Sequence, residues 1–141
     1  MRDQFRCWEA VSVRWGDMDT LGHVNNAKYF TYCESARMRY FELLDLLSFR
    51  THERQGPGVV SATCNFRQQV HYPAELEVGA RVTEIRNRSF TLAYEIYRKA
   101  SDELVADGTS VVVWVDYTEG RAIPLPDELK KKICEFDNLS G

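Results

Sequence analysis

The sequence predicts an α+β fold, in which an antiparallel sheet of about five strands packs against one long helix. Three observations predict this fold. A helical hydrophobic period extends from about residue 26 to residue 47. Four segments with the character of strands follow it, at residues 60–66, 76–83, 90–97 and 105–117. Only short stretches of turn-forming residues separate the last three, which is typical of neighbouring antiparallel strands.

A strand is also expected before the helix, at residues 5–15. Apolar side chains recur there at odd positions, so that one face of the strand would carry Phe5, Cys7, Val11, Val13 and Trp15. A polar loop follows this strand. Asn25 or Asn26 is the expected N-cap of the helix, because an Asn side chain can accept a hydrogen bond from the free amides of the first turn.

The long helix has a single apolar stripe with spacings of four and three residues. The stripe consists of Tyr29, Cys33, Ala36, Tyr40, Leu43 and Leu47. Its length favours one central helix that crosses the whole sheet. Glu34 lies on the flank of this stripe, with Arg37 one turn away. A surface ion pair and a role in a binding site are both open for Glu34.

The remaining segments complete one predicted domain over residues 1–141. A polar connector at 48–57 is expected to end at the turn formed by Gly56-Pro57-Gly58. A short C-terminal helix is expected to begin at Pro126. Leu129, Ile133 and Phe136 would share its apolar side.

The composition excludes several classes of protein. The formal net charge is −3, which gives no electrostatic indication of nucleic-acid binding. The first ten residues lack the apolar core of a signal peptide. The longest clean apolar run, 111–115, is much too short to span a membrane. We therefore expect a soluble, cytoplasmic protein without a membrane partner.

The cysteines indicate neither a metal site nor a disulfide framework. They are widely scattered, with no CxxC pair: Cys7, Cys33, Cys64 and Cys134. Reduced thiols that act as small packing residues are the expected state.

The loop between the first strand and the helix concentrates the polar chemistry of the chain. Asp17, Asp19, His23, Asn25 and Asn26 fall within ten residues. A helix N-terminus carries unpaired N–H groups and partial positive charge, so it can stabilise a developing anion. A carboxylate beside it can act as a base or a nucleophile on the same group. These residues are the candidate catalytic site.

The sequence of this loop resembles that of a known family. The motif is RWGDMDTLGHVNN at 14–26, followed by Tyr29 and by ESAR at 34–37, and a second match is EIRNRSF at 84–90. Over nearly its whole length the chain resembles the hot-dog fold, and more narrowly the 4-hydroxybenzoyl-CoA thioesterase-like acyl-CoA thioesterases. In that fold the antiparallel sheet wraps around the central helix.

The resemblance implies a mechanism of thioester hydrolysis. Asp19, three residues before Gly22, matches the catalytic aspartate, which attacks the thioester carbonyl or activates a water molecule that does so. The backbone N–H at Asn26 would polarise the carbonyl oxygen from the helix N-terminus. No metal or organic cofactor is implied.

The candidate substrate-binding residues come from both matches. They are His23, Asn25, Tyr29, Glu34, Arg86 and Arg88. In the family, a basic cluster at the second match lies near the nucleotide phosphates of CoA. Arg86 and Arg88 match the first and third positions of that cluster, whereas Asn87 replaces the middle one.

The residues by themselves leave other roles open. Asp19 is also suited to a loop-capping role, as many Asp residues before helices are. Asp17 is an alternative acting carboxylate, although orienting the loop or pairing with Arg14 suits its position better. His23 is an alternative general base, with pocket shaping or hydrogen bonding to the loop as its other role. Arg86 and Arg88 also fit solvent-facing charges of a turn.

The leading hypothesis is therefore an acyl-CoA thioesterase that releases a free carboxylic acid and CoA. The alternatives are an acyl-carrier-protein thioesterase, a hot-dog dehydratase and a non-catalytic acyl-binding protein. The resemblance also implies a homodimer at least, and a homotetramer in its larger form, with residues of two subunits around each acyl pocket. Pairing of subunits would also cover the strand edges that a single sheet leaves open.

Overall fold

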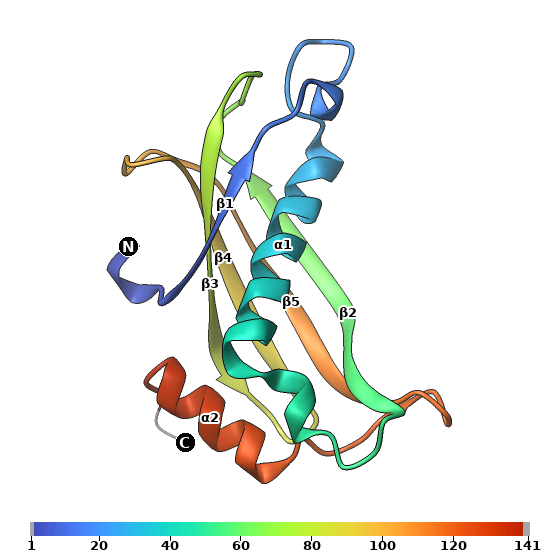
Figure 1. Ribbon diagram of the computed structural model, residues 1–141. Coiled ribbons are helices and arrows are strands. Elements are labelled where there is room, and N and C mark those ends of the chain that lie inside the picture. Colours follow the sequence, from blue (N-terminus) through green and yellow to red (C-terminus); the bar gives the residue numbers. More distant parts are fainter. Residues whose placement is uncertain (1, 140–141) are drawn as a thin grey trace.

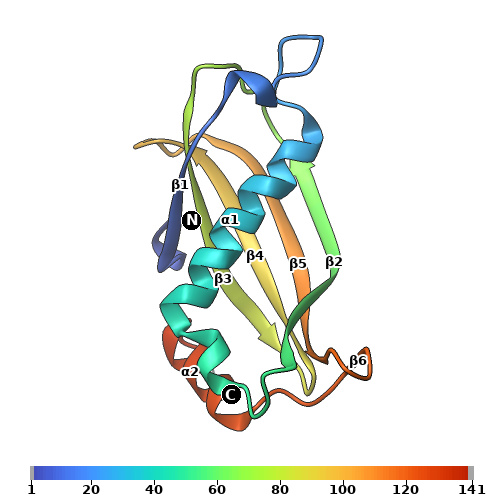
Figure 2. The same ribbon diagram turned by 45° about the vertical axis from the view of Figure 1, so that its right-hand side comes forward.

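In the computed structural model, which describes residues 2–139, a curved antiparallel sheet wraps around one long helix (Figures 1 and 2). The strands are β1 (Cys7–Ser12), β2 (Gln55–Phe66), β3 (Glu75–Ile85), β4 (Ser89–Arg98), β5 (Leu104–Asp116) and the short β6 (Arg121–Ala122). The helices are α1 (Asn26–Leu44) and α2 (Asp127–Phe136), with 3-10 turns at Arg2–Gln4, Trp15–Asp17 and Leu46–Phe49. The strand order is β1-β3-β4-β5-β2, and β6 pairs with β5. The predicted α+β fold is confirmed.

Helix α1 packs on the concave face of the sheet through one buried stripe. Its members are Tyr29, Tyr32, Cys33, Ala36, Tyr40 and Leu44. The prediction was wrong for the last turn, where Leu43 and Leu47 are exposed. The reason is that α1 ends at Leu44, and Asp45 takes a left-handed conformation with φ 50° and ψ 50°. The left-handed residue interrupts the helical period, so that Leu46 is buried in the core and Leu47 is not.

The first strand is shorter than expected, and Trp15 does not belong to its buried face. Trp15 lies in a 3-10 turn after β1 and is 76% exposed. Phe5 and Val13 are buried as predicted, although they flank the strand. Alternation of residue types indicated the apolar face but not the point where the strand ends.

Strand β2 begins earlier than expected, because the Gly56-Pro57-Gly58 segment is part of the strand and not a turn. Proline is tolerated in an edge strand, where one row of backbone groups has no partner strand. The Tyr117 hydroxyl donates to the carbonyl oxygen of Pro57 at 2.6 Å. A Cβ at Gly56 would lie only 2.8 Å from the Tyr117 hydroxyl oxygen, so a larger residue there would have to displace the Tyr117 side chain and its hydrogen bond to Pro57.

Helix α2 covers one end of the sheet, and its buried residues Leu129 and Ile133 confirm the predicted apolar side. The residue after the helix, Asp137, accepts a hydrogen bond from the Val82 N–H at 2.8 Å and another from the Tyr40 hydroxyl. Burial raises the pKa of the Asp137 carboxyl group. Within residues 2–139, neither helix is long and apolar enough to cross a membrane.

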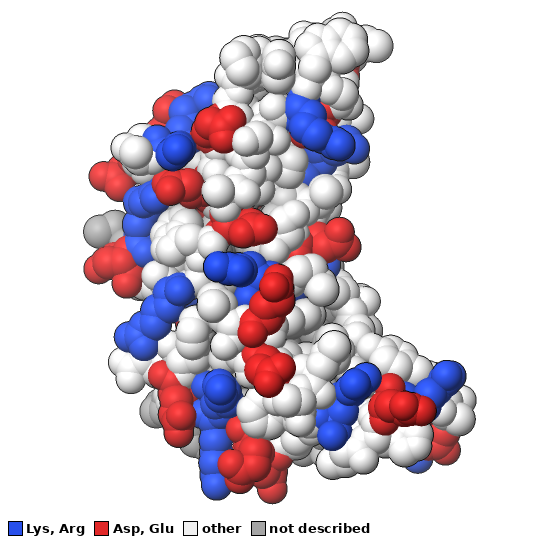
Figure 3. Space-filling model, in the orientation of Figure 1, with Lys and Arg blue, Asp and Glu red and all other residues white. Residues whose placement is uncertain are grey.

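The fold separates two groups of predicted site residues. The loop between β1 and α1 lies at one end of the sheet, beside the end of β2 (Figures 1 and 2). The β3–β4 turn lies at the opposite end, near α2. On the face in Figure 3, charged side chains of both signs are interspersed, and few of them are seen at the top of this view.

Candidate functional site

Asp17 is a buried carboxylate that holds the start of the loop together. Its Oδ2 accepts hydrogen bonds from the Tyr32 hydroxyl at 2.7 Å and from the Arg14 N–H at 3.0 Å. The Arg14 guanidinium pairs with Oδ1 at 3.1 Å. Burial by itself would raise the pKa of Asp17, but these hydrogen bonds and the guanidinium charge outweigh it and lower the pKa. The pairing with Arg14 that the sequence favoured is present.

The loop after Asp17 has a defined backbone conformation. Asp19 N–H donates to the His23 carbonyl at 2.8 Å, which closes a turn in which Gly22 has φ +83°. Val24 N–H donates to the Val70 carbonyl at 2.9 Å and thereby attaches the loop to the segment between β2 and β3. A positive φ is readily adopted only by glycine, so Gly22 permits this turn.

Asp19 is exposed, in contrast to Asp17. Its Oδ1 accepts hydrogen bonds from the N–H groups of Leu21 at 2.9 Å and His23 at 3.2 Å. These bonds orient the carboxylate in the loop-capping geometry that the sequence left open. Its Oδ2 accepts no hydrogen bond from the described part of the chain. One oxygen therefore fixes the side chain, and the other is available to a ligand.

Asp19 lines a hollow of about 300 Å³ at the N-terminus of α1. The other lining residues are His23, Val24, Asn26, Tyr29, Phe66, Arg67, Gln68 and Gln69. Asn25 is the N-cap, and its Oδ1 accepts a hydrogen bond from the Ala27 N–H at 3.0 Å. The Asn26 N–H has no acceptor among residues 2–139. The hollow is thus lined by the residue with the free carboxylate oxygen, Asp19, and by the residue with the unpaired N-terminal amide, Asn26.

His71 contributes a contact that sequence reasoning missed. Its Nδ1 lies 2.8 Å from the carbonyl oxygen of Gly22, and because a carbonyl oxygen only accepts, this nitrogen donates. The His71 ring packs against that of His23, with centroids 4.8 Å apart, while His23 Nδ1 is buried without a partner. No local motif signals this role, because His71 is 49 positions from the residue that it holds.

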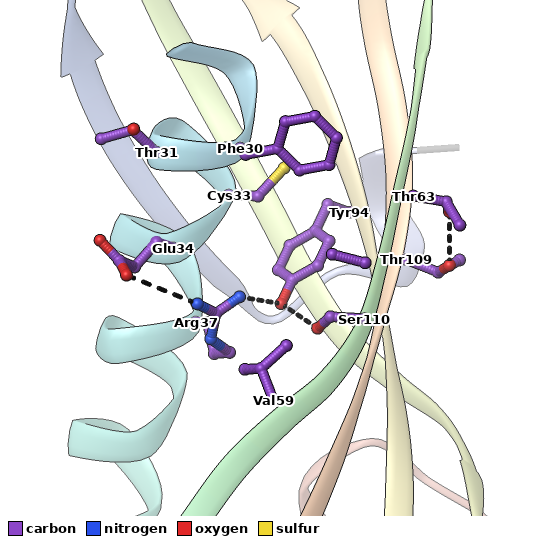
Figure 4. A pocket seen from close by; sticks show the side chains of 11 residues that line it. Phe30, Thr31, Cys33, Glu34, Arg37, Val59, Thr63, Tyr94, Thr109 and Ser110 are labelled. Carbon is purple, nitrogen blue, oxygen red and sulfur yellow. Dashed lines mark hydrogen bonds and ion pairs between the residues drawn. The ribbon is translucent and has the colours of Figure 1, made fainter. Parts of the chain in front are cut away.

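A second hollow, of about 200 Å³, lies farther along α1 between the helix and the sheet (Figure 4). Arg37 donates to the Tyr94 hydroxyl at 3.2 Å, and that hydroxyl is 2.6 Å from the Ser110 oxygen. Glu34 lies at the rim, with Oε2 3.8 Å from an Arg37 nitrogen. Burial raises the pKa of Tyr94 above its ordinary value, which already lies well above neutral pH. The sequence suggested the Glu34–Arg37 pair but not the two hydroxyls.

Arg86 and Arg88 lie at the far end of the sheet from Asp19 (Figures 1 and 2). Arg86 pairs with Glu84 at 3.0 Å and lines a hollow of about 630 Å³ with Lys130 of α2. Arg88, two positions farther along the same turn, is exposed. One chain does not bring these arginines to the hollow of Asp19.

The predicted site residues therefore fall into three places. The N-terminal end of α1 carries Asp19, His23, Asn25, Asn26 and Tyr29, the middle of α1 carries Glu34, and the β3–β4 turn carries Arg86 and Arg88. In the described chain, no group of three or more His, Cys, Asp or Glu residues is placed to hold a metal ion.

Comparison with known proteins gives one consistent family. Residues 13–133 match the model of the thioesterase-like superfamily. The long-chain acyl-CoA thioesterase FadM of Escherichia coli is 27% identical, over 87% of this chain and 93% of FadM. The PA2801 protein of Pseudomonas aeruginosa superposes with a TM-score of 0.81 at 31% identity, covering 92% of this chain and 98% of its own.

A further solved structure has a bound ligand. It is a thioesterase from Thermus thermophilus complexed with coenzyme A and Zn. The T. thermophilus structure superposes on the present chain with a TM-score of 0.82 at 29% identity, covering 96% of the present chain and 98% of the T. thermophilus chain.

Proposed function

This chain belongs to the thioesterase-like superfamily, has the hot-dog fold and is a thioester hydrolase; from this premise we propose that it hydrolyses acyl-CoA thioesters to carboxylic acids and CoA. The names of two relatives support this substrate class, because FadM is an acyl-CoA thioesterase and the T. thermophilus thioesterase binds coenzyme A. The single observation that carries the proposal is that one hollow is lined by both Asp19, which has a free carboxylate oxygen, and Asn26, whose backbone amide has no acceptor among residues 2–139.

Asp19 is the proposed acting carboxylate. Its Oδ2 either attacks the carbonyl carbon of the thioester or removes a proton from a water molecule that attacks it. In both routes a C–O bond forms, the carbonyl oxygen gains negative charge, and the C–S bond then breaks to release the CoA thiolate. Attack by water gives the carboxylic acid directly, and the proton taken up by Asp19 passes to the thiolate or to solvent. Attack by Asp19 itself leaves a mixed anhydride, which a water molecule then hydrolyses to release the acid and regenerate the carboxylate. A thiolate is a good leaving group because thiols are more acidic than alcohols, so no strong general acid is required.

The Asn26 N–H is the proposed donor to the developing oxyanion. It belongs to the first turn of α1, where the helix dipole adds partial positive charge. A preorganised amide donor of this kind typically contributes about 10²- to 10³-fold to the rate. The Asn25 cap supports this role, because it satisfies the neighbouring Ala27 amide and fixes the direction of the helix start.

Asp17 is less suited to the acting role. Both of its oxygens already accept hydrogen bonds, and the carboxylate is buried away from the hollow. The contrast with Asp19, which is exposed and has one free oxygen, supports the assignment of catalysis to Asp19 and of loop structure to Asp17.

Binding of the CoA nucleotide is proposed to involve a second subunit. Arg86 and Arg88 lie at the end of the sheet opposite Asp19, so they can serve that hollow only from a partner chain. Strand β2 is an edge strand in the described chain, and its pairing with a second β2 would join two sheets into one. We therefore propose a homodimer at least, which can assemble further into a tetramer.

The test is the Asp19→Asn variant on a panel of acyl-CoA esters, with release of free thiol as the readout. We expect kcat to fall about 10²- to 10⁴-fold, which is the usual contribution of a positioned acid–base group. Asp102→Asn is the matched control, because Asp102 is an exposed Asp in the β4–β5 turn, and it should retain wild-type turnover. Wild-type turnover by Asp19→Asn would reject the assignment. The same acyl groups presented on a carrier protein test the alternative donor.

A further inference from the structure

The hollow in the middle of α1 contains a cation that the protein only partly compensates. The Arg37 side chain is 13% exposed, and the carbon atoms of Phe30, Cys33 and Val59 surround the opening. Figure 4 shows the guanidinium directed from α1 towards the hydroxyls of Tyr94 and Ser110. A guanidinium that has lost most of its water requires replacement hydrogen bonds or an anion.

The hydrogen bonds of Arg37 leave most of its donors free. A guanidinium has five N–H donors, and one of them is directed at the neutral Tyr94 hydroxyl. Glu34 is the nearest carboxylate, but its 3.8 Å separation is too long for a hydrogen bond, and its side chain is 62% exposed. The other Arg37 nitrogens have no acceptor within residues 2–139, and none is sealed in the core without access to open space.

We propose that this hollow binds the distal end of the acyl group, and that Arg37 selects acyl groups that end in a carboxylate. The inference rests on the proposed function, since it names the substrate class of the same enzyme. A planar guanidinium matches a carboxylate through paired, charge-assisted hydrogen bonds. The apolar walls of the hollow suit the methylene groups that precede that carboxylate.

The position of the hollow is consistent with this role. Both the catalytic hollow and this one have α1 on one side and residues of β2 on the other. Arg37 follows Asn26 by eleven positions, which corresponds to about 16 Å along a helix axis. A volume of about 200 Å³ is below that of sites for whole drug-sized ligands, so it suits the end of an acyl group only.

An apolar acyl end is the competing occupant. Beyond Arg37, a groove of about 470 Å³ is lined mainly by apolar side chains, including Met38, Phe41 and Leu47. A long hydrocarbon chain would have to pass the guanidinium to reach it, and would displace water from the cation without replacing its hydrogen bonds. This energetic penalty favours the carboxylate.

The experiment compares two CoA esters of equal length, one ending in a carboxylate and the other in a methyl group. We expect the wild type to have the higher kcat/KM for the carboxylate-ended ester. Arg37→Met should lower kcat/KM for that ester about tenfold to a hundredfold and should not lower it for the methyl-ended ester. Arg37→Lys keeps the charge but not the paired donors, so its kcat/KM for the carboxylate-ended ester should lie between those of the wild type and Arg37→Met.

The Glu34→Gln variant tests the same inference independently, because it leaves Arg37 intact. Removing the rim carboxylate should increase the preference for the carboxylate-ended ester, because less negative charge opposes it. This result would support the inference even if Arg37→Met failed to fold. A wild type that prefers the methyl-ended ester, together with equal losses for both esters in Arg37→Met, would overturn the inference and leave the thioesterase proposal standing. Absence of turnover with any acyl-CoA would instead reject the proposed function.

Discussion

Asp17 and Asp19 lie two positions apart in one loop, but their surroundings differ. Asp17 is buried and accepts hydrogen bonds on both oxygens, whereas Asp19 is exposed and keeps one oxygen free. A carboxylate whose hydrogen bonds are all satisfied stabilises the fold, and one with a free oxygen can react with a ligand. The two neighbouring aspartates thus divide structural and proposed chemical roles between them.

The lowered pKa of Asp17 predicts a pH-dependent contribution to stability. A carboxyl group with a lower pKa in the folded than in the unfolded protein stabilises the fold above the unfolded value, here about 3.8. This contribution is lost as the pH falls through the lower folded pKa. We expect Asp17→Asn to reduce the free energy of unfolding by about 1–3 kcal/mol at pH 7, and the gap to the wild type should narrow below pH ~4.

Urea denaturation at pH 7 and at acidic pH measures this gap. Tyr32→Phe removes a single donor to Asp17 and is expected to have a smaller effect at pH 7. A gap between the wild type and Asp17→Asn that stays constant down to the acid limit would contradict the role of the ionised carboxylate.

At the scale of elements, the start of α1 serves both structure and proposed chemistry. Asn25 fixes the first turn, and the same turn presents the free amide of Asn26. The other end of α1 has only a structural role. The left-handed Asp45 ends the helix there and directs Leu46 into the core. The side-chain cap therefore fixes α1 at the end where the proposed site lies.

Removal of the N-cap separates the two roles of Asn25. Asn25→Ala is expected to lower the free energy of unfolding by about 1 kcal/mol, because the Ala27 amide loses its acceptor. Asn25→Ser keeps an oxygen acceptor and should retain most of the stability. Chemical denaturation and kcat/KM are measured together. If Asn25 also binds substrate, Asn25→Ser will lower kcat/KM without loss of stability, and full activity in Asn25→Ser would limit the residue to capping.

At the scale of the whole molecule, strand β2 is the feature that needs a partner. It pairs with β5 on one side and has no partner strand on the other within residues 2–139. Val59, Val60 and Phe66 are large apolar residues exposed on this strand. An exposed edge of this length favours pairing with a second chain.

The Val60→Lys variant tests this pairing. Val60 is 64% exposed, and a charge there should oppose the approach of a second β2. We expect a lower oligomeric state by sedimentation velocity and a lower kcat/KM for CoA esters, because Arg86 and Arg88 would come from the partner. Thr118→Lys adds the same charge at an exposed turn and should leave the assembly intact. A wild type that sediments as a monomer would refute the proposed dimer.

The sequence by itself determined the features that depend on near neighbours. Hydrophobic periodicity gave the central helix and the strands, because the side chains of each element repeat with its own period. The cluster of polar residues in the loop was visible because its members are close in the chain, and two of them, Asp19 and His23, line the same hollow. The motif around them also carried the family resemblance that the comparisons confirm.

Only the tertiary structure decided which distant residues meet. His71 reaches Gly22 across 49 positions, and Tyr94 reaches Arg37 across 57, because the sheet order places β4 beneath α1 and the end of β2 beside the loop. The same topology puts Arg86 and Arg88 at the far end from Asp19 and makes β2 an edge strand. Periodicity shows which face of an element is apolar, but contacts between elements depend on how the whole chain packs.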